Sequence, residues 1–369
     1  MMVKENSESR LVIMLSKPKL SNSEAEELNY LLKSHLDWAK VMGLVLMNRI
    51  IGPAWRNICK YADIKDDENK FTYLFKVFGQ SYKTQRYIVN EQQKYITELC
   101  EALNDNGIEY ALLKGIILSH FVYEEAGERN FNDIDILVNA DQISTAVKVL
   151  NDLGFVQGRY NHETKSIIPF SRKEIITMPL ISHQIQPLVR QIKSQFLNYI
   201  KVDIQFSIDL MTNNRTDKIV QKFIDRREKV EIDNHSLYRL EWEDMLLFCC
   251  IHFYKEATHY EEVIFNRDLL LYKILDLYQI IYSQQLNWNV FCSRIEEYNL
   301  VKEVYYALYY AHSIYDCVPS GVLEKLTPDD TKFINELDII DSKHIWSDSI
   351  NERIFNFNRA RIIEEKIKK

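Results

Sequence analysis

The stretch Arg129-Asn130-Phe131-Asn132-Asp133-Ile134-Asp135-Ile136-Leu137-Val138 decides how the fold of this chain is interpreted. Between Phe131 and Val138 two aspartates alternate with apolar residues, which is the period-2 pattern of a β-strand with one polar and one apolar face. Asp133 and Asp135 therefore point in the same direction, close enough for their carboxylate oxygens to share a hard cation. Such a pair more often lies at a solvent-exposed sheet edge than in a metal site. The neighbouring segments are therefore needed to distinguish an exposed edge from a metal site.

The residues before this stretch predict a second strand followed by a tight turn. Ile108 to Leu113 is a short apolar run bounded by turn residues, as in a buried strand. It ends at Lys114-Gly115, and residues 116–123 have the pattern of a short helix. At such a turn, backbone N–H groups and the positive end of the helix can bind phosphate oxygens. Lys114 also fits a solvated cap at a strand end.

A third aspartate belongs to a further predicted strand. Between Tyr199 and Ile208 apolar side chains alternate with polar ones, and Asp203 lies on the polar side. Arg129, just before the first acidic strand, is a candidate phosphate clamp because a guanidinium group matches phosphate oxygens in a bidentate way. An ion pair of Arg129 with Asp133 or Glu128 is the structural alternative.

Helical patterns dominate the rest of the chain. Ser21 and Glu24 have the spacing of a capping box before the first apolar stripe, and helical stripes continue to about residue 103. Four more stripes follow residue 241, and the charged tail 351–369 would dock on these helices, bind a partner or be solvated. The predicted organisation is a flexible leader over 1–20, an N-terminal helical region over 21–106, a mixed core over 107–235 and a C-terminal helical domain over 236–369.

The composition excludes several classes of protein. An apolar fraction of 46% with 9 Gly and 7 Pro is typical of a folded, mainly helical chain. No apolar run approaches the roughly 18 to 20 residues that span a membrane, and the polar start is no signal sequence, so we expect a cytoplasmic protein. The six cysteines lack metal-binding spacing. A formal net charge of −7 argues against binding of long nucleic acids and permits a small anionic ligand.

Together these motifs resemble the nucleotidyltransferase superfamily with a DNA-polymerase-beta-like core, and within it a bacterial group of uncharacterised nucleotidyltransferases. The resemblance extends over residues 36–285, with the motifs in the same order as in that group. The matching segments are Leu112-Leu113-Lys114-Gly115, Tyr123, Arg129, Asp133-Ile134-Asp135-Ile136-Leu137-Val138 and Leu153-Gly154-Phe155. Where many relatives carry a histidine two residues after the third acid, this chain has Gln205, which puts any role of that histidine in doubt.

The resemblance implies an α+β fold in which a small mixed β-sheet, the nucleotidyltransferase core, is flanked by N-terminal helices and a C-terminal helical domain. It implies that Asp133 and Asp135 coordinate the Mg²⁺ (or Mn²⁺) of a bound nucleoside triphosphate, with ATP as the expected co-substrate. Asp203 would help to bind a second metal ion that lowers the pKa of the acceptor hydroxyl. In-line attack on the α-phosphorus would release pyrophosphate, whose charge Arg129 and the Lys114-Gly115 turn would help to neutralise.

Three further candidates have structural alternatives. Lys273 and Asp276 lie three apart on a predicted helix, so they share a face and would pair with each other unless Lys273 reaches the triphosphate. His252 lies in an apolar helical run, where a hydrogen-bonded core histidine is the more common case. His183 falls among basic residues that line either a substrate cleft or a solvated loop.

The acceptor is not specified by these residues. A small molecule, a peptide or a protein side chain suits the acidic chain better than long RNA does, and modification of an RNA end by a toxin-like enzyme is the second hypothesis. A protein that binds nucleotide without catalysis is the third. Three like charges on one face have no evident purpose in a protein without catalysis, which argues for an enzyme.

Overall fold

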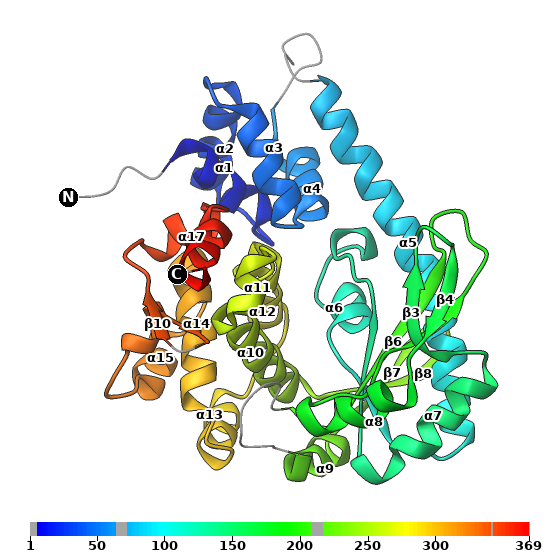
Figure 1. The fold of residues 1–369 in the computed structure, drawn as a ribbon. Helices are drawn as coiled ribbons and strands as arrows, with labels where there is room; N and C mark the ends of the chain where they lie inside the picture. Colours follow the sequence, from blue (N-terminus) through cyan, green and yellow to red (C-terminus); the bar gives the residue numbers. More distant parts are fainter. Residues whose placement is uncertain (1–5, 64–71, 209–216, 341, 369) are drawn as a thin grey trace. The chain divides into compact units, whose positions relative to one another are not determined.

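The computed structural model describes residues 6–63, 72–208, 217–340 and 342–368, which form two compact units (Figure 1). The helical unit comprises residues 1–85, 127–129 and 249–369. The sheet unit comprises residues 86–126 and 130–248. Helices from both ends of the chain thus share one unit, whereas the sequence predicts an N-terminal helical region and a C-terminal helical domain as separate segments.

A mixed β-sheet organises the sheet unit, as the α+β prediction requires. Its order is β4-β3-β5-β6-β2-β1-β8-β7. The strands are β1 (Tyr110–Leu112), β2 (Ile134–Val138), β3 (Val156–Asn161), β4 (Ser166–Pro169), β5 (Leu188–Gln191), β6 (Tyr199–Gln205), β7 (Glu228–Ile232) and β8 (His235–Arg239). The pairs β2·β6 and β1·β8 are parallel and the other pairs are antiparallel. The sheet is larger than predicted, because the sequence indicated only β1, β2 and β6.

Strands β2 and β6 lie side by side near the middle of this sheet. All five residues of β2 are buried, which fits an apolar strand covered on both faces. The parallel register pairs Ile134 with Val202 and Asp135 with Asp203. Both strands are shorter than predicted, so Asp133 lies one residue before β2 begins.

The sheet unit also contains helices. They are the second part of α5 (Thr72–Asp105), α6 (Gly115–Phe121), α7 (Ile143–Asp152), α8 (Arg172–Ile181) and α9 (Asp217–Asp225). Short 3₁₀ turns η2 (Ala126–Glu128) and η3 (Ala140–Gln142) complete the local structure. Gly154 follows α7 with a φ of +84°, the left-handed conformation that ends many helices and that glycine adopts most readily.

The helical unit is built from both ends of the chain. Its first elements are α1 (Ser7–Ser16), α2 (Asn22–Lys33), α3 (Trp38–Met47), α4 (Ile51–Tyr61) and the start of α5. The later ones are the end of α10 (Trp242–Thr258), then α11 (Tyr260–Ile264), α12 (Leu271–Ser283), α13 (Trp288–Glu297), α14 (Val301–Tyr315), α15 (Ser320–Leu326), η4 (Lys332–Asn335), β9 (Glu336–Ile339), β10 (Ser342–Ile345), α16 (Ile350–Phe355) and α17 (Arg359–Ile367). Within the described residues no helix is long and apolar enough to cross a membrane.

The flexible leader predicted over residues 1–20 is wrong for α1. Leu11, Val12, Met14 and Leu15 of this helix are completely buried. Asn6 caps the helix by accepting a hydrogen bond from the backbone N–H of Glu8. The polar residues at the very start of the chain, of which 1–5 lie outside the described residues, obscured an apolar helix that belongs to the core.

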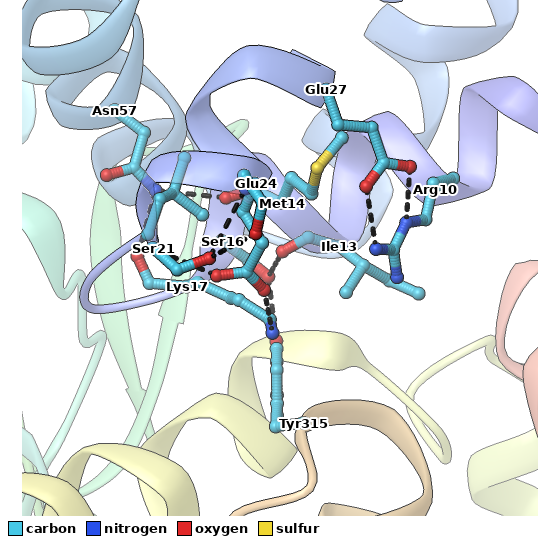
Figure 2. A network of polar contacts seen from close by, with 12 residues as sticks. Arg10, Ile13, Met14, Ser16, Lys17, Ser21, Glu24, Glu27, Asn57 and Tyr315 are labelled. Atoms are coloured by element: carbon cyan, nitrogen blue, oxygen red, sulfur yellow. Dashed lines mark hydrogen bonds and ion pairs between the residues drawn. The ribbon is translucent and has the colours of Figure 1, made fainter.

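Polar contacts join the two ends of the chain inside the helical unit (Figure 2). The Ser16 and Tyr315 hydroxyl groups lie 2.8 Å apart and are both buried. Nearby, Lys17 pairs with Glu24 at 2.6 Å, and Glu24 also completes the predicted capping box with Ser21 at the start of α2. The N-terminal helices are thus fixed to α14 by a buried hydrogen bond.

The C-terminal tail docks within the helical unit, which was one of the three alternatives from the sequence. Ile354 and Ile363 are completely buried, whereas Ile362 on the outer side of α17 is 36% exposed. Ile363 packs with Leu337 and Trp346 in a small apolar cluster. The tail therefore buries its apolar side chains together with Arg353 and Arg359, and its other described charged residues lie on the outer face.

Two helical glycines offer a matched test of packing in this unit. A Cβ at Gly52 in α4 would lie 2.5 Å from the Glu128 Cα and 2.7 Å from the Gly127 carbonyl oxygen, both backbone atoms. A Cβ at Gly43 in α3 would meet nothing within 4 Å. We expect Gly52→Ala to lower the free energy of unfolding by about 1–3 kcal/mol, and Gly43→Ala to raise it by about 0.5–1 kcal/mol. Urea unfolding of both variants checks this, and equal effects would contradict it.

Candidate active site

The parallel register of β2 and β6 brings the predicted acids together in the sheet unit. Asp135 and Asp203 are directly paired, and residues in register on neighbouring strands lie about 4.8 Å apart and share a face. Asp135 and Asp203 are 9% and 5% exposed, so both carboxyl groups are largely removed from water. Asp133 is linked to Asp203 through a single lysine side chain.

Lys201 provides this link and was not singled out from the sequence. Its Nζ lies 2.7 Å from Oδ2 of Asp203 and 3.3 Å from Oδ2 of Asp133. Lys201 precedes Asp203 by two residues on β6, so both side chains leave the strand on the same face. The alternation that identified Asp203 also placed Lys201 on the polar face, and this was the signal that could have found it.

Two other side chains hold Asp135. The Gln205 amide donates a 2.9 Å hydrogen bond to Oδ1, and Lys114 Nζ lies 3.5 Å from Oδ2. Lys114 also lies over the ring of Phe248, 5.6 Å from its centre. Gln205 therefore orients a predicted metal ligand.

The pKa values reflect burial opposed by these lysines. Burial raises the pKa of Asp203 to about 6, although Lys201 acts in the opposite direction. Burial likewise raises the pKa of Asp135, while Lys114 lowers it. Burial alone would lower the pKa of Lys201, but Asp203 and Asp133 raise it above its usual value. The carboxylates are thus costly to keep charged without a cation beside them.

The chemistry of this cluster fits a hard divalent cation. All three acids offer carboxylate oxygens, the ligands that Mg²⁺ prefers. Oδ1 of Asp203 is buried and has no hydrogen-bond partner among the residues described. Within those residues, no three His, Cys, Asp or Glu side chains are arranged as a ready metal site, and Lys201 lies between two of the acids instead. A cation bound by all three acids therefore requires Lys201 to move.

The Lys114-Gly115 turn has an unusual backbone. Lys114 has a φ of +36° and Gly115 a φ of +23°, and the first value is costly for a residue with a Cβ. Such outliers persist where surrounding structure fixes them, often at ligand sites. The following helix α6 has seven residues, too short for a strong dipole, so the expected phosphate contact depends on the Lys114 side chain and the turn itself.

Arg129 belongs to the helical unit, whereas the acids belong to the sheet unit. Its Nε and Nη2 donate to the carboxylate of Asp276 at 2.8 Å each, in a buried bidentate pair. Its guanidinium group also lies over the ring of Tyr272. Neither Asp133 nor Glu128 is its partner in this pair, and Glu128 instead pairs with Arg56 at 2.8 Å.

The side chain of Lys273 also contacts partners inside the helical unit. It is 7% exposed, pairs with Glu256 at 2.6 Å and donates to the backbone carbonyl oxygens of Arg267 and Asp268. Its predicted neighbour on the helix, Asp276, takes Arg129 as its bidentate partner instead. His252 lies 3.1 Å from Glu256 as well, as expected for a histidine with a structural role.

His183 lies in the segment between α8 and β5, beside the end of strand β6. Its backbone carbonyl accepts a hydrogen bond from the N–H of Phe206, and its side chain is buried. Arg190, from the same basic region of the sequence, is neutralised by Glu98 at 2.5 Å. In this basic region Arg190 is thus paired, whereas Arg172 and Lys173 are exposed.

Comparisons with known proteins identify the family of this chain. A sequence profile of the family described as uncharacterised nucleotidyltransferase matches residues 34–316. A crystal structure of an antigenic nucleotidyltransferase-like protein from Paracoccidioides brasiliensis is similar at 12% identity and a TM-score of 0.32, covering 64% of this chain and 93% of that chain. At that TM-score it adds nothing to the family match. No curated protein matches the chain.

Proposed function

The chain belongs to this family of uncharacterised nucleotidyltransferases, and we propose that it transfers a nucleoside monophosphate from a nucleoside triphosphate to an acceptor hydroxyl or phosphate group. The observation that carries the proposal is the register of β2 and β6, which pairs Asp135 with Asp203 and brings Asp133 to the same lysine as Asp203. Three buried or half-buried acids on one face suit the binding of cations with phosphates attached.

We assign the binding of Mg²⁺ or Mn²⁺ to Asp133, Asp135 and Asp203. When bound, the metal neutralises the charge that develops on the phosphate oxygens and lowers the pKa of the acceptor hydroxyl. Gln205 fixes the orientation of the Asp135 carboxylate. The orphaned Oδ1 of Asp203 supports a ligand role for this residue.

The triphosphate, with ATP as the expected nucleotide, is assigned to Lys114 and the backbone of Gly115. Lys114 already lies 3.5 Å from Asp135, where the phosphates of a metal-bound nucleotide would arrive. Arg129 lies in the helical unit, where Asp276 holds two of its nitrogens, and it is left out of the phosphate contacts proposed for the sheet unit. Lys273 is committed to Glu256 and is left out of the proposed phosphate contacts.

The acceptor is proposed to be a small molecule, a peptide or a protein. The formal charge of −7 disfavours long nucleic acids, and Glu98 neutralises one of the basic residues near the sheet. An RNA end is the second candidate, because Arg172 and Lys173 at the start of α8 are exposed and free to meet phosphates.

One assay separates these functions. The protein is incubated with each NTP, Mg²⁺ or Mn²⁺ and cell extract, and pyrophosphate release and the mass of modified species are followed. Metal-dependent turnover that is lost in Asp133→Ala supports the proposal, and a labelled RNA identifies the RNA-end alternative. Nucleotide binding without turnover would identify a protein that regulates rather than catalyses.

A further inference from the structure

Lys201 occupies the position between two acids where a cation ligated by both would lie. Its Nζ is 2.7 Å from Asp203 and 3.3 Å from Asp133, so one ammonium group compensates two carboxylates. In the register of the sheet, Ile134 pairs with Val202, which places Lys201 beside Asp133. The position of this lysine thus follows from the same strand pairing that assembles the acids.

The charge balance shows why Lys201 matters for metal binding. Asp133, Asp135 and Asp203, together with Lys114 and Lys201, carry one excess negative charge. Removing Lys201 would leave two excess negative charges at the same place and would attract a divalent cation much more strongly. The Lys201 side chain is 32% exposed and unbranched, so it can leave the carboxylates without rearranging the core.

We propose that Lys201 is an internal counter-ion that competes with the divalent metal for Asp133 and Asp203, and that it moves to the triphosphate when a metal-bound nucleotide enters. The inference rests on the proposed function of this site. The free protein then binds metal alone weakly, because the ion must displace an ammonium group from the two carboxylates with which it is paired. A metal-bound nucleotide binds more readily, because its phosphates accept the displaced lysine.

The test is a titration of the full chain with Mn²⁺, in which free Mn²⁺ is measured by electron paramagnetic resonance. Lys201→Met is expected to bind Mn²⁺ at least about tenfold more tightly than the wild type, because a competing charge at close range is gone. Lys201→Arg keeps the charge and should bind as weakly as the wild type. Lys229→Met, which removes an exposed lysine of β7, is the control for net charge and should differ little from the wild type.

Thermal unfolding with and without Mn²⁺ gives a second readout if a variant is unstable. Lys201→Met should unfold at a lower temperature without metal and gain more from Mn²⁺ than the wild type does. Equal Mn²⁺ affinity in wild type and Lys201→Met, or no Mn²⁺ binding in either, would overturn the inference. Tighter Mn²⁺ binding by Lys201→Met in a protein that never releases pyrophosphate would uphold the inference and reject the proposed reaction.

Discussion

Asp135→Asn is expected to lower kcat by about 10³-fold or more, equivalent to about 4 kcal/mol of transition-state stabilisation. The substitution keeps the size of the side chain and removes a negatively charged metal ligand between Gln205 and Lys114. Because burial raises the pKa of Asp135, its carboxylate destabilises the metal-free fold, and a neutral amide should not. Activity should therefore be lost while the free energy of unfolding is kept or increased.

Steady-state pyrophosphate release and urea unfolding of the same preparation measure the two effects. Asp141→Asn is the matched control, since Asp141 lies on the exposed turn η3 just after β2 and takes no part in the proposed site. The control should keep wild-type activity. Turnover of Asp135→Asn within tenfold of the wild type would contradict the assignment of Asp135 as a metal ligand.

The sequence predicted the strands that carry the three aspartates, but it did not predict which strands pair with each other. Asp133, Asp135 and Asp203 could be placed because apolar and polar residues alternate clearly around them. Parallel pairing of β2 with β6 joins segments about 70 residues apart, and no local pattern encodes such a contact. The alternation places Lys201 on the same face as Asp203, but its contact with Asp133 depends on the pairing of the two strands and was visible only in the structure.

The hairpin of β7 and β8 was missed although it carries a signal. Ile232 pairs with His235 across a two-residue loop. That loop, Asp233-Asn234, has φ values of +48° and +66°, as a type I′ turn requires, and Asp and Asn tolerate this conformation better than most residues. The flanking strands are mostly polar and half-exposed, and the apolar alternation in β7 is limited to Val230 and Ile232, too short to mark a strand clearly.

For Arg129 and Lys273, the sequence could not show which groups their charged side chains contact. Both residues were candidate phosphate ligands, yet each has an acidic partner: Arg129 pairs with the buried Asp276, and Lys273 pairs with the partly buried Glu256. A charged residue in a folded chain more often satisfies a local partner than a ligand, and sequence alone gives the charge but not the partner. Only the structure could separate these roles.

Arg359→Leu is expected to cause the largest loss of stability, about 3–5 kcal/mol in the free energy of unfolding. Arg359 and Asp268 are 0% and 1% exposed, and two nitrogens of the guanidinium group donate to the Asp268 carboxylate at 2.9 and 3.0 Å. Arg359 also donates to the backbone carbonyl oxygen of Asn356 at 3.0 Å. Its loss leaves a buried negative charge and orphaned carbonyl oxygens.

Arg361→Leu on the same helix is the control. Arg361 pairs with Glu365 at 2.8 Å, but the two side chains are 80% and 60% exposed, so its replacement should cost less than about 1 kcal/mol. The double variant Arg359→Leu/Asp268→Asn should recover part of the loss, because the uncompensated buried charge is gone. If Arg359→Leu costs no more than Arg361→Leu in urea unfolding, the C-terminal helix does not depend on this buried pair, and its docking rests on apolar packing around Ile363 alone.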